Sequence, residues 1–260
     1  MEHEDFGGLH DDLLLTGASM RRRDLIRWAT GAGVLHLLGC SADGTSAGGG
    51  GNASCRLIPA ETAGPFPGDG SNGPNVLSAA GAVRSDIRSS FAGLTGTAPG
   101  IELTFTLIVQ SATDCAPLAG RAVYAWHCDR AGRYSLYSAG VIDQNYLRGV
   151  QETDAAGAVT FRTIFPGCYA GRWPHIHFEV YPSLAAASSA GNKSATSQLA
   201  LPQAACSLVY ATTGYEASVA NLNGVSLATD NVFSDGADRQ LATIAGTVGA
   251  GFTASLAVPI

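Results

Sequence analysis

The chain has 260 residues, 46% of them hydrophobic, and a formal net charge of −6. Beyond a short N-terminal run its basic residues form no patch, which excludes nucleic acid and acidic surfaces as partners. A chain of this length can bury a large core in one domain, above all in an all-β fold.

The N-terminus, residues 1–40, is predicted to be an extension followed by an export signal. Consecutive arginines begin at Arg21 and precede a weakly apolar run, 28–38, which is typical of twin-arginine export. That run has 11 residues, too few to span a bilayer. It leads to Cys40 in a sequence similar to a lipobox. We therefore expect a periplasmic or cell-surface lipoprotein whose membrane contact is a lipid on Cys40, or a secreted form.

Composition also predicts two boundaries. The first 19 residues contain five acids and no Lys or Arg, so we expect the true start at Met20. Residues 41–54 are rich in Gly and Ser and nearly uncharged, which predicts a flexible tether, and residues 55–260 then form the folded domain. Removing residues 1–40 takes away four basic and six acidic residues, which leaves 11 basic and 15 acidic residues and a net charge of −4.

Five cysteines follow the predicted signal: Cys55, Cys115, Cys128, Cys168 and Cys206. An exported protein folds in an oxidising compartment, so we expect one or two disulfides and an odd thiol left over. No CxxC pair is present, which argues against a zinc ribbon. The sequence leaves open which cysteines pair and whether Cys40 is lipidated.

Short segments of nearly alternating apolar and β-prone residues, separated by Gly- and Pro-containing turns, recur along the domain. This pattern predicts strands at 103–109, 122–126, 159–164, 176–181, 240–248 and 252–258. Helical pattern is weak and confined to 203–222, and we expect 184–197 to be a loop. Strands at this spacing predict an all-β, antiparallel sandwich with long loops and little helix.

The strand predicted at 176–181 directly follows the first of two histidines, in the run His175-Ile176-His177. Successive strand residues face opposite sides, so both imidazoles point the same way with Cα atoms roughly 7 Å apart, close enough to bind one metal ion. The chain has six histidines, three of them within residues 1–40. The pair therefore reads as half of a metal site, although two structural histidines at a strand end would give the same pattern.

Further motifs surround the pair. They are Gly-Arg-Tyr at Tyr134, Pro-Gly-x-Tyr at Tyr169, an arginine three residues before His175 at Arg172, Gln198, and Thr-Ala-Gly-Pro-Phe at 62–66. In this order they resemble the intradiol ring-cleavage dioxygenases, and the resemblance extends from about Cys55 to the C-terminus. It is strongest to an exported, often lipoprotein-type bacterial branch, which shares 83–88 and 145–149.

The resemblance implies an Ig-like or transthyretin-like β-sandwich that binds Fe(III) through Tyr134, Tyr169, His175 and His177. A hard ferric ion favours anionic oxygen donors, and bound metal holds a phenol deprotonated far below its free pKa of about 10. The family cleaves a catechol with O2 between the two hydroxylated carbons to a cis,cis-muconate-type diacid, incorporating both oxygen atoms.

Catalytic roles are implied for three residues. Tyr169 is the ligand that the substrate displaces, Arg172 stabilises negative charge developing on the ring, and Gln198 adds a hydrogen bond. Gly64 and Pro65 are expected to line the substrate cavity through backbone and shape. Only five residues separate Tyr169 from His175, fewer than in the enzymes that act on aromatic acids. We therefore expect an open pocket for a simple or substituted catechol, and the sequence does not say which.

Other interpretations stay open at this point. Tyr137 is the nearest rival to Tyr134 as a ligand, and His127 is expected to be structural. Glu179 shares the strand face of the histidine pair, which allows a ferrous His/His/Glu triad. A zinc hydrolase would need a third ligand that the spacing does not supply. The alternative that is not an enzyme is a non-catalytic cell-surface binding module with the same β-sandwich. The sequence does not predict the oligomeric state.

Overall fold

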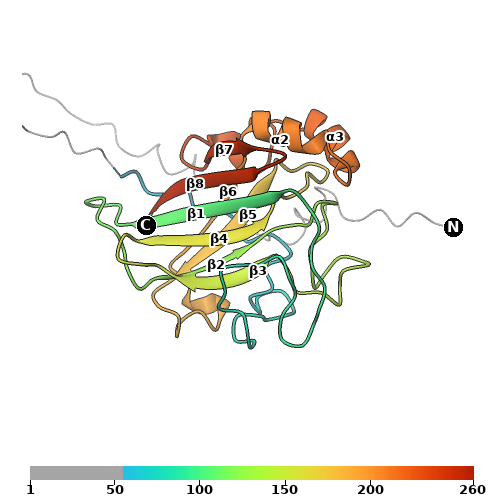
Figure 1. Cartoon of the computed structure of the whole chain (residues 1–260). Coiled ribbons are helices and arrows are strands. Elements are labelled where there is room, and N and C mark those ends of the chain that lie inside the picture. The colour runs from blue at the N-terminus through green and yellow to red at the C-terminus, as the bar shows by residue number, and fades with distance from the viewer. Residues whose placement is uncertain (1–54) are drawn as a thin grey trace, which may run out of the picture.

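Eight strands form two four-stranded sheets in residues 55–260, the part of the chain that the computed structural model describes (Figure 1). One sheet has the strand order β4-β1-β8-β7 and the other β3-β2-β5-β6. The strands are β1 Glu102–Gln110, β2 Ala122–Trp126, β3 Arg148–Glu152, β4 Ala158–Ile164, β5 His175–Tyr181, β6 Ala195–Ala200, β7 Thr243–Thr247 and β8 Gly251–Pro259. The helices are α2 Gln203–Tyr210 and α3 Glu216–Asn223, with short 3-10 helices η2 Ala190–Asn192 and η3 Phe233–Asp235.

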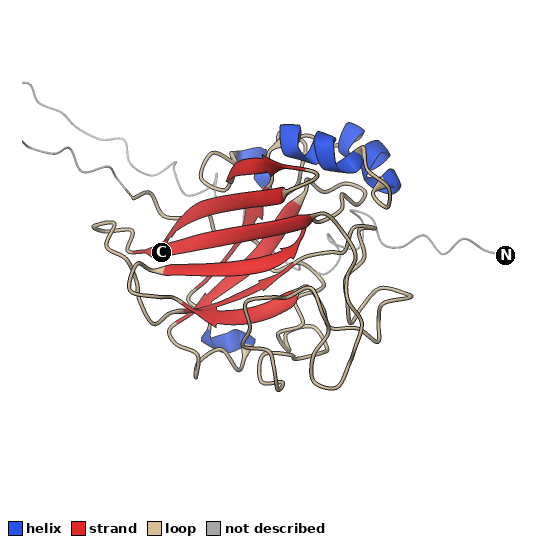
Figure 2. Cartoon of the chain, in the orientation of Figure 1, coloured by secondary structure: helices blue, strands red, loops and turns tan. Residues whose placement is uncertain are grey.

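The structure is mostly β with few helices, in agreement with the predicted all-β fold with little helix, and all six predicted strands are present. Two strands were missed. β3 has the sequence RGVQE and β6 the sequence ATSQLA, and neither shows the apolar alternation that marks a strand. The end of the predicted loop 184–197 is therefore wrong, because β6 begins at Ala195. The predicted helical region 203–222 is confirmed as α2 and α3, which lie together along one edge of the sheets, near β7 (Figures 1 and 2).

The prediction of a purely antiparallel sandwich is wrong at one pair of strands. β8 runs parallel to β1, from Leu103 opposite Phe252 to Gln110 opposite Pro259, and antiparallel to β7 on its other side. Alternation in a sequence reports which faces of a strand are buried and carries no information on the direction of its neighbour, so the pattern could not reveal this. The closer likeness to an Ig-like or transthyretin-like topology stays a prediction.

The core lies between the two sheets. β1 alternates strictly, with Leu103, Phe105, Leu107 and Val109 buried, and it packs in one cluster with the alternate residues Ile176, Phe178 and Val180 of β5. The other face of the second sheet is covered as well, since all residues of β2 and β5 are buried. Loops form this second cover: side chains such as Val76, Phe91 and Tyr134 pack with Tyr124 and Trp126 of β2.

This arrangement places the histidine pair. Because Ile176 faces the core between the sheets, His175 and His177 face the loop-covered side, and the register sets His177 beside Trp126 of β2 and Gln198 of β6. Buried polar groups on such a face need partners, so the loops that cover them must supply polar groups or a ligand.

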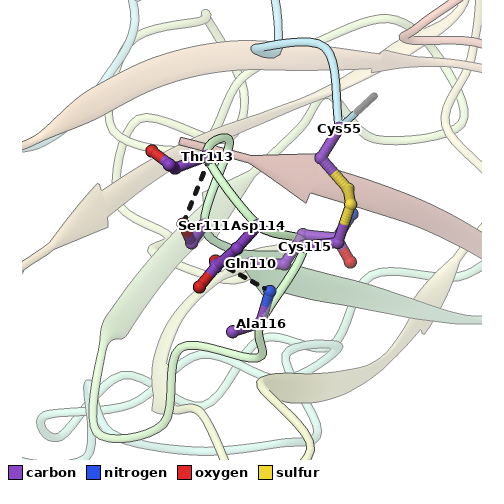
Figure 3. The surroundings of a disulfide bond; sticks show 7 residues. All are labelled: Cys55, Gln110, Ser111, Thr113, Asp114, Cys115 and Ala116. Carbon is purple, nitrogen blue, oxygen red and sulfur yellow. Dashed lines mark hydrogen bonds between the residues drawn. A yellow bond between two sulfur atoms is a disulfide. The ribbon is translucent and has the colours of Figure 1, made fainter. Parts of the chain in front are cut away.

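A disulfide joins Cys55 to Cys115 and closes a loop of 60 residues (Figure 3). It ties the start of the described chain to the turn after β1. Two hydrogen bonds shape that turn: the Ser111 hydroxyl accepts the backbone N–H of Thr113, and the Asp114 carboxylate accepts that of Ala116. Cys128, Cys168 and Cys206 are buried free thiols. Among the described residues no helix is long and apolar enough to cross a membrane. The predicted start at Met20, signal, lipobox Cys40 and tether fall outside these residues.

Candidate metal centre

His175 and His177 converge through their Nε2 atoms, which are 3.0 Å apart. Both side chains are buried. The Nδ1–H of His175 donates to the carbonyl oxygen of Trp173 at 2.5 Å, so the lone pair of Nε2 faces the other histidine. A hydrogen bond from the remote ring nitrogen is the usual way in which a metal-binding histidine is oriented.

His177 is held differently. Its ring stacks on Trp126 with the centroids 4.8 Å apart and the planes at 5°, and its Nδ1 is buried without a hydrogen-bond partner. On another side lies Gly64, where φ is +68° and an added Cβ would come 3.5 Å from His177 Cε1. The stacked indole and the glycine backbone together fix the plane of this ring.

Two tyrosines complete the cluster, and both come from loops. Tyr134 follows a turn after β2, in which the Asp129 carboxylate accepts the backbone N–H groups of Ala131 and Arg133. The hydroxyl of Tyr134 lies 3.5 Å from that of Tyr169 and 3.4 Å from Nε2 of His175. The hydroxyl of Tyr169, in the loop between β4 and β5, is also 3.4 Å from that nitrogen. Two phenol oxygens and two imidazole nitrogens thus meet at one point.

Electrostatics suit these side chains to act as metal ligands. Burial, and secondly the charge of Arg172, lower the pKa of His175 to about 3, so its imidazole is neutral. Burial also holds the pKa of His177 well below its ordinary value. Burial and the neighbouring Tyr169 raise the pKa of Tyr134 well above 10. A buried phenol of this kind ionises only when a cation compensates its charge, and bound metal provides one.

The four donor atoms fit one metal ion. Bonds from a transition metal to nitrogen or oxygen ligands are about 2.0–2.2 Å long, so neighbouring ligands around one ion lie about 3.0–3.5 Å apart. The observed separations of 3.0 to 3.5 Å fall in that range. Residues 55–260 contain no group of three or more His, Cys, Asp or Glu side chains that could hold a metal, so the donor set depends on the tyrosines.

The carboxylate alternative to this set does not assemble. Glu179 is buried on the same strand face as the histidines, but its Oε2 accepts the Tyr181 hydroxyl at 2.6 Å and its Oε1 accepts Lys193 Nζ at 2.7 Å. Both carboxylate oxygens of Glu179 therefore have hydrogen-bond partners other than a metal. The ferrous His/His/Glu triad and the zinc site have no third ligand among the described residues.

Arg172 lies beside the cluster, buried, with its guanidinium in a fixed position. Its Nε donates to Asp230 Oδ2 at 3.0 Å and its Nη2 to Gln198 Oε1 at 2.7 Å. Although burial alone lowers its pKa, the nearby Tyr169 and Asp230 outweigh burial and raise the pKa above its ordinary value. The centre is thus accompanied by a permanent positive charge.

Asp230 is the residue of this site that sequence reasoning missed. It is fully buried and lies 58 residues from Arg172 along the chain. Neither its spacing nor a motif links it to the other residues, and an Asp ahead of a short turn is common. Only the fold brings it to the centre.

The remaining predicted residues lie as follows. Tyr137 points away from the cluster, because its hydroxyl donates to the Asn72 carbonyl oxygen and accepts from the N–H of Gly68, each at 2.9 Å. His127 contacts Cys128 O and Thr163 Oγ1 with its two ring nitrogens and is not among the four donors. Pro65 is half-buried next to Gly64, and its carbonyl accepts a hydrogen bond from Asn72.

The segment 62–66 runs along one side of the cluster. The Thr62 carbonyl oxygen accepts a hydrogen bond from Gln198 Nε2 at 3.0 Å, and Gly64 faces His177. The ring centroids of Phe66 and Tyr134 are 5.0 Å apart. Residues 63–66 and Tyr169 are only half-buried, so the rim of the centre is accessible. A surface hollow elsewhere, lined by Leu227, Ala228, Phe233, Ser234, Gly236, Ala237, Asp238 and Leu241, contains none of the four donor residues.

Comparison with known proteins shows a family model and several solved structures to which the chain is similar. A family model described as "Dioxygenase" matches residues 72–195, just under half of the chain. Solved structures share the fold. An intradiol ring-cleavage dioxygenase from Tetranychus urticae is 24% identical with a TM-score of 0.61, over 79% of this chain and 95% of that one. The dioxygenase domain of a dioxygenase and carbohydrate-binding protein fusion from Streptomyces sp. SirexAA-E is 23% identical with a TM-score of 0.50, over 78% and 97%.

A third similar structure is the 3-chlorocatechol 1,2-dioxygenase from Rhodococcus opacus 1CP, which is 20% identical with a TM-score of 0.50, over 79% of this chain and 73% of that one. Among curated proteins none matches at a significant level. At these identities the structures establish the fold, and the family match covers the loop of Tyr134 and all of β5. The predicted resemblance is confirmed, and the predicted enzyme class, an intradiol ring-cleaving oxidoreductase, is that of these proteins.

Proposed function

Since residues 72–195 match the dioxygenase family and the domain has the fold of intradiol ring-cleavage dioxygenases, we propose that the chain is a non-haem Fe(III) intradiol dioxygenase. One observation supports this above the others. Tyr134, Tyr169, His175 and His177 bring two phenol oxygens and two imidazole nitrogens within 3.5 Å of their neighbours in the cluster. Anionic oxygen donors are what a hard ferric ion favours, and no zinc or ferrous set assembles among the described residues.

When bound, Fe(III) would supply a Lewis acid that activates a chelating catechol toward O2. The chain's own residues prepare for this. Tyr134 and the two histidines are buried and positioned, whereas Tyr169 is half-buried and lies on the accessible side. Of the four residues that would hold the iron, Tyr169 is therefore the one most accessible to a catechol, and its oxygen would be placed to accept a proton from a substrate hydroxyl.

Arg172 supplies a preorganised positive charge. Its guanidinium is buried beside the donor cluster and anchored by Asp230 and Gln198. A cation that does not have to reorient stabilises negative charge that appears on the aromatic ring during attack by oxygen. Gln198 would act chiefly by holding the guanidinium and the segment at Thr62 together, because its amide bridges them.

We propose that the substrate is a simple or substituted catechol and the product a cis,cis-muconate-type diacid that contains both atoms of O2. The half-buried rim at 63–66 supports access for a substrate larger than the ring alone. Gly64 and Pro65 would shape that rim, with Gly64 next to His177.

The test is oxygen uptake by iron-loaded protein with a panel of catechols, followed by identification of the product. We expect a red to burgundy protein, from charge transfer between the tyrosinates and Fe(III), and a ring-opened diacid. An extradiol semialdehyde would contradict the mechanism, and a colourless protein with iron bound would contradict tyrosinate ligation. Catechol binding without oxygen uptake by the coloured protein would support the non-catalytic binding module.

We also propose that the protein works outside the cytoplasm, either lipidated at Cys40 or secreted. The disulfide between Cys55 and Cys115 supports this, because disulfides persist in oxidising compartments. The test is fractionation of cells that express the full chain, beside a Cys40→Ser variant. Membrane-bound protein that Cys40→Ser releases in soluble form would identify the lipidated form, and soluble protein outside the cytoplasm would identify the secreted form. A wholly cytosolic protein would refute export.

A further inference from the structure

The guanidinium of Arg172 is held through two of its nitrogen atoms. Asp230 Oδ2 accepts its Nε–H at 3.0 Å, and Gln198 Oε1 accepts from its Nη2 at 2.7 Å. Because guanidinium is planar and rigid, hydrogen bonds at two different nitrogen atoms restrict both its position and its orientation. Gln198 cannot fix the group alone, since a single hydrogen bond leaves rotation about that bond free.

Asp230 is itself held firmly. Its Oδ1 accepts the backbone N–H groups of Val232 at 2.8 Å and Phe233 at 3.0 Å, which places the carboxylate at the start of η3. Asp230 is fully buried and Arg172 is 4% exposed, so each ion compensates the other away from water. Removing one partner of such a pair leaves an uncompensated buried charge.

The same carboxylate also reaches the first histidine of the cluster. Its Oδ2 accepts the backbone N–H of Trp173 at 2.7 Å, and the carbonyl oxygen of Trp173 accepts the Nδ1–H of His175 at 2.5 Å. One oxygen atom of Asp230 therefore anchors both the cation and Trp173, the residue whose carbonyl oxygen determines the tautomer of His175.

We propose that Asp230 is a positioning residue of the ring-cleavage reaction, which orients the guanidinium of Arg172 and, through Trp173, the imidazole of His175. This inference rests on the proposed function. Asp230 touches neither substrate nor metal in this assignment. Its effect on the reaction is transmitted mainly by Arg172, and that dependence separates it from an ion pair that only stabilises the fold.

The experiment is a double-mutant cycle with Asp230→Asn and Arg172→Gln in the full chain, assayed with catechol after iron loading. Asp230→Asn should lower kcat and kcat/KM together by at least tenfold, because the oriented charge acts on the transition state. In the Arg172→Gln background the same substitution should lower kcat less than twofold. Asp69→Asn is the matched control: it also removes a buried carboxylate paired with a cation, Lys193, and should lower kcat less than twofold.

Thermal unfolding of the iron-free variants gives a readout that does not depend on activity. Each single substitution should lower the unfolding midpoint, because each leaves one buried charge or hydrogen-bonding group without its partner. The double variant should lose clearly less than the sum of the two. If Asp230→Asn does not fold, the cycle is run with Asp230→Glu, which keeps the charge and displaces it by one methylene.

The outcomes are distinct. An equal loss of kcat in both backgrounds, a wild-type kcat in Asp230→Asn, or additive shifts of the midpoints would overturn the inference and leave the proposed function standing. An iron-loaded wild-type protein that cleaves no catechol would instead overturn the proposed function, and the role of Asp230 in that reaction with it.

Discussion

Tyr134 and Tyr137 stand three residues apart, and replacing each by phenylalanine should affect different properties of the protein: stability for Tyr137 and iron binding for Tyr134. The hydroxyl of Tyr137 makes two hydrogen bonds at 2.9 Å, with Gly68 N and Asn72 O. Each contributes about 0.5–1.5 kcal/mol to stability, so Tyr137→Phe should lower the free energy of unfolding of the metal-free protein by about 1–3 kcal/mol. The hydroxyl of Tyr134 has contacts at 3.4 and 3.5 Å, long for O–H hydrogen bonds, so Tyr134→Phe should cost less than about 1 kcal/mol.

The order reverses once iron is bound. Tyr134→Phe removes one of four donors, so we expect the affinity for Fe(III) to fall by more than about tenfold, about 1.4 kcal/mol, and the visible absorption band to shift or bleach. Tyr137→Phe should retain both the band and the affinity. Urea unfolding of the metal-free proteins and visible spectra after iron loading measure the two effects. A wild-type spectrum in Tyr134→Phe with iron bound, or equal bleaching in both variants, would refute the assignment of Tyr134 as a ligand.

Three further predictions concern the fold around the centre. Replacing Cys55 and Cys115 by Ser opens a loop of 60 residues and should lower the free energy of unfolding by up to about 4 kcal/mol, measured in urea; an unchanged midpoint after reduction of the wild type would contradict this. Burial lowers the pKa of His127 to about 4, below the unfolded value near 6.5, so the unfolded state binds the proton first and stability falls as the pH drops from 6.5 to 4. In iron-free protein, His127→Gln should reduce that fall in the free energy of unfolding by about 3 kcal/mol. If the free energy of unfolding depends on pH in the same way in the variant and the wild type, the prediction is wrong. Gly64→Ala, at φ +68°, should lower the free energy of unfolding by about 1–2 kcal/mol, and the control Gly73→Ala, at φ +89°, should lower it by a similar amount. The colour of the iron-loaded protein should persist in both variants. Bleaching by Gly64→Ala alone would show that the added Cβ displaces a ligand.

Much of the fold could be predicted from local pattern. The six strands with apolar alternation are present because alternation reports burial of one face, as in β1. β3 and β6 were not predicted because loops and neighbouring strands bury them. Their buried polar residues, such as Arg148 and Gln198, do not produce an apolar pattern in the sequence. The parallel pairing of β1 with β8 was not predicted either, because the relative direction of two strands depends on the whole path of the chain.

The candidate site divides in the same way. Strand geometry alone requires His175 and His177 to share a face, and the order of the motifs in the sequence predicts Tyr134, Tyr169 and Arg172 as their companions. The choice of Tyr134 over Tyr137 and the exclusion of Glu179 as a ligand needed hydrogen bonds to residues far along the chain.

The sequence by itself thus determined a pair of imidazoles on one strand face and the side chains available to complete a metal site, because the period of a strand is a local property. Only the tertiary structure decided which side chains meet there. Tyr134 and Tyr169 reach the histidines because loops fold back over β5, and Asp230 reaches Arg172 across 58 residues because the segment before η3 packs against the turn at Trp173. Contacts over such separations depend on the packed path of the chain, which no local pattern encodes.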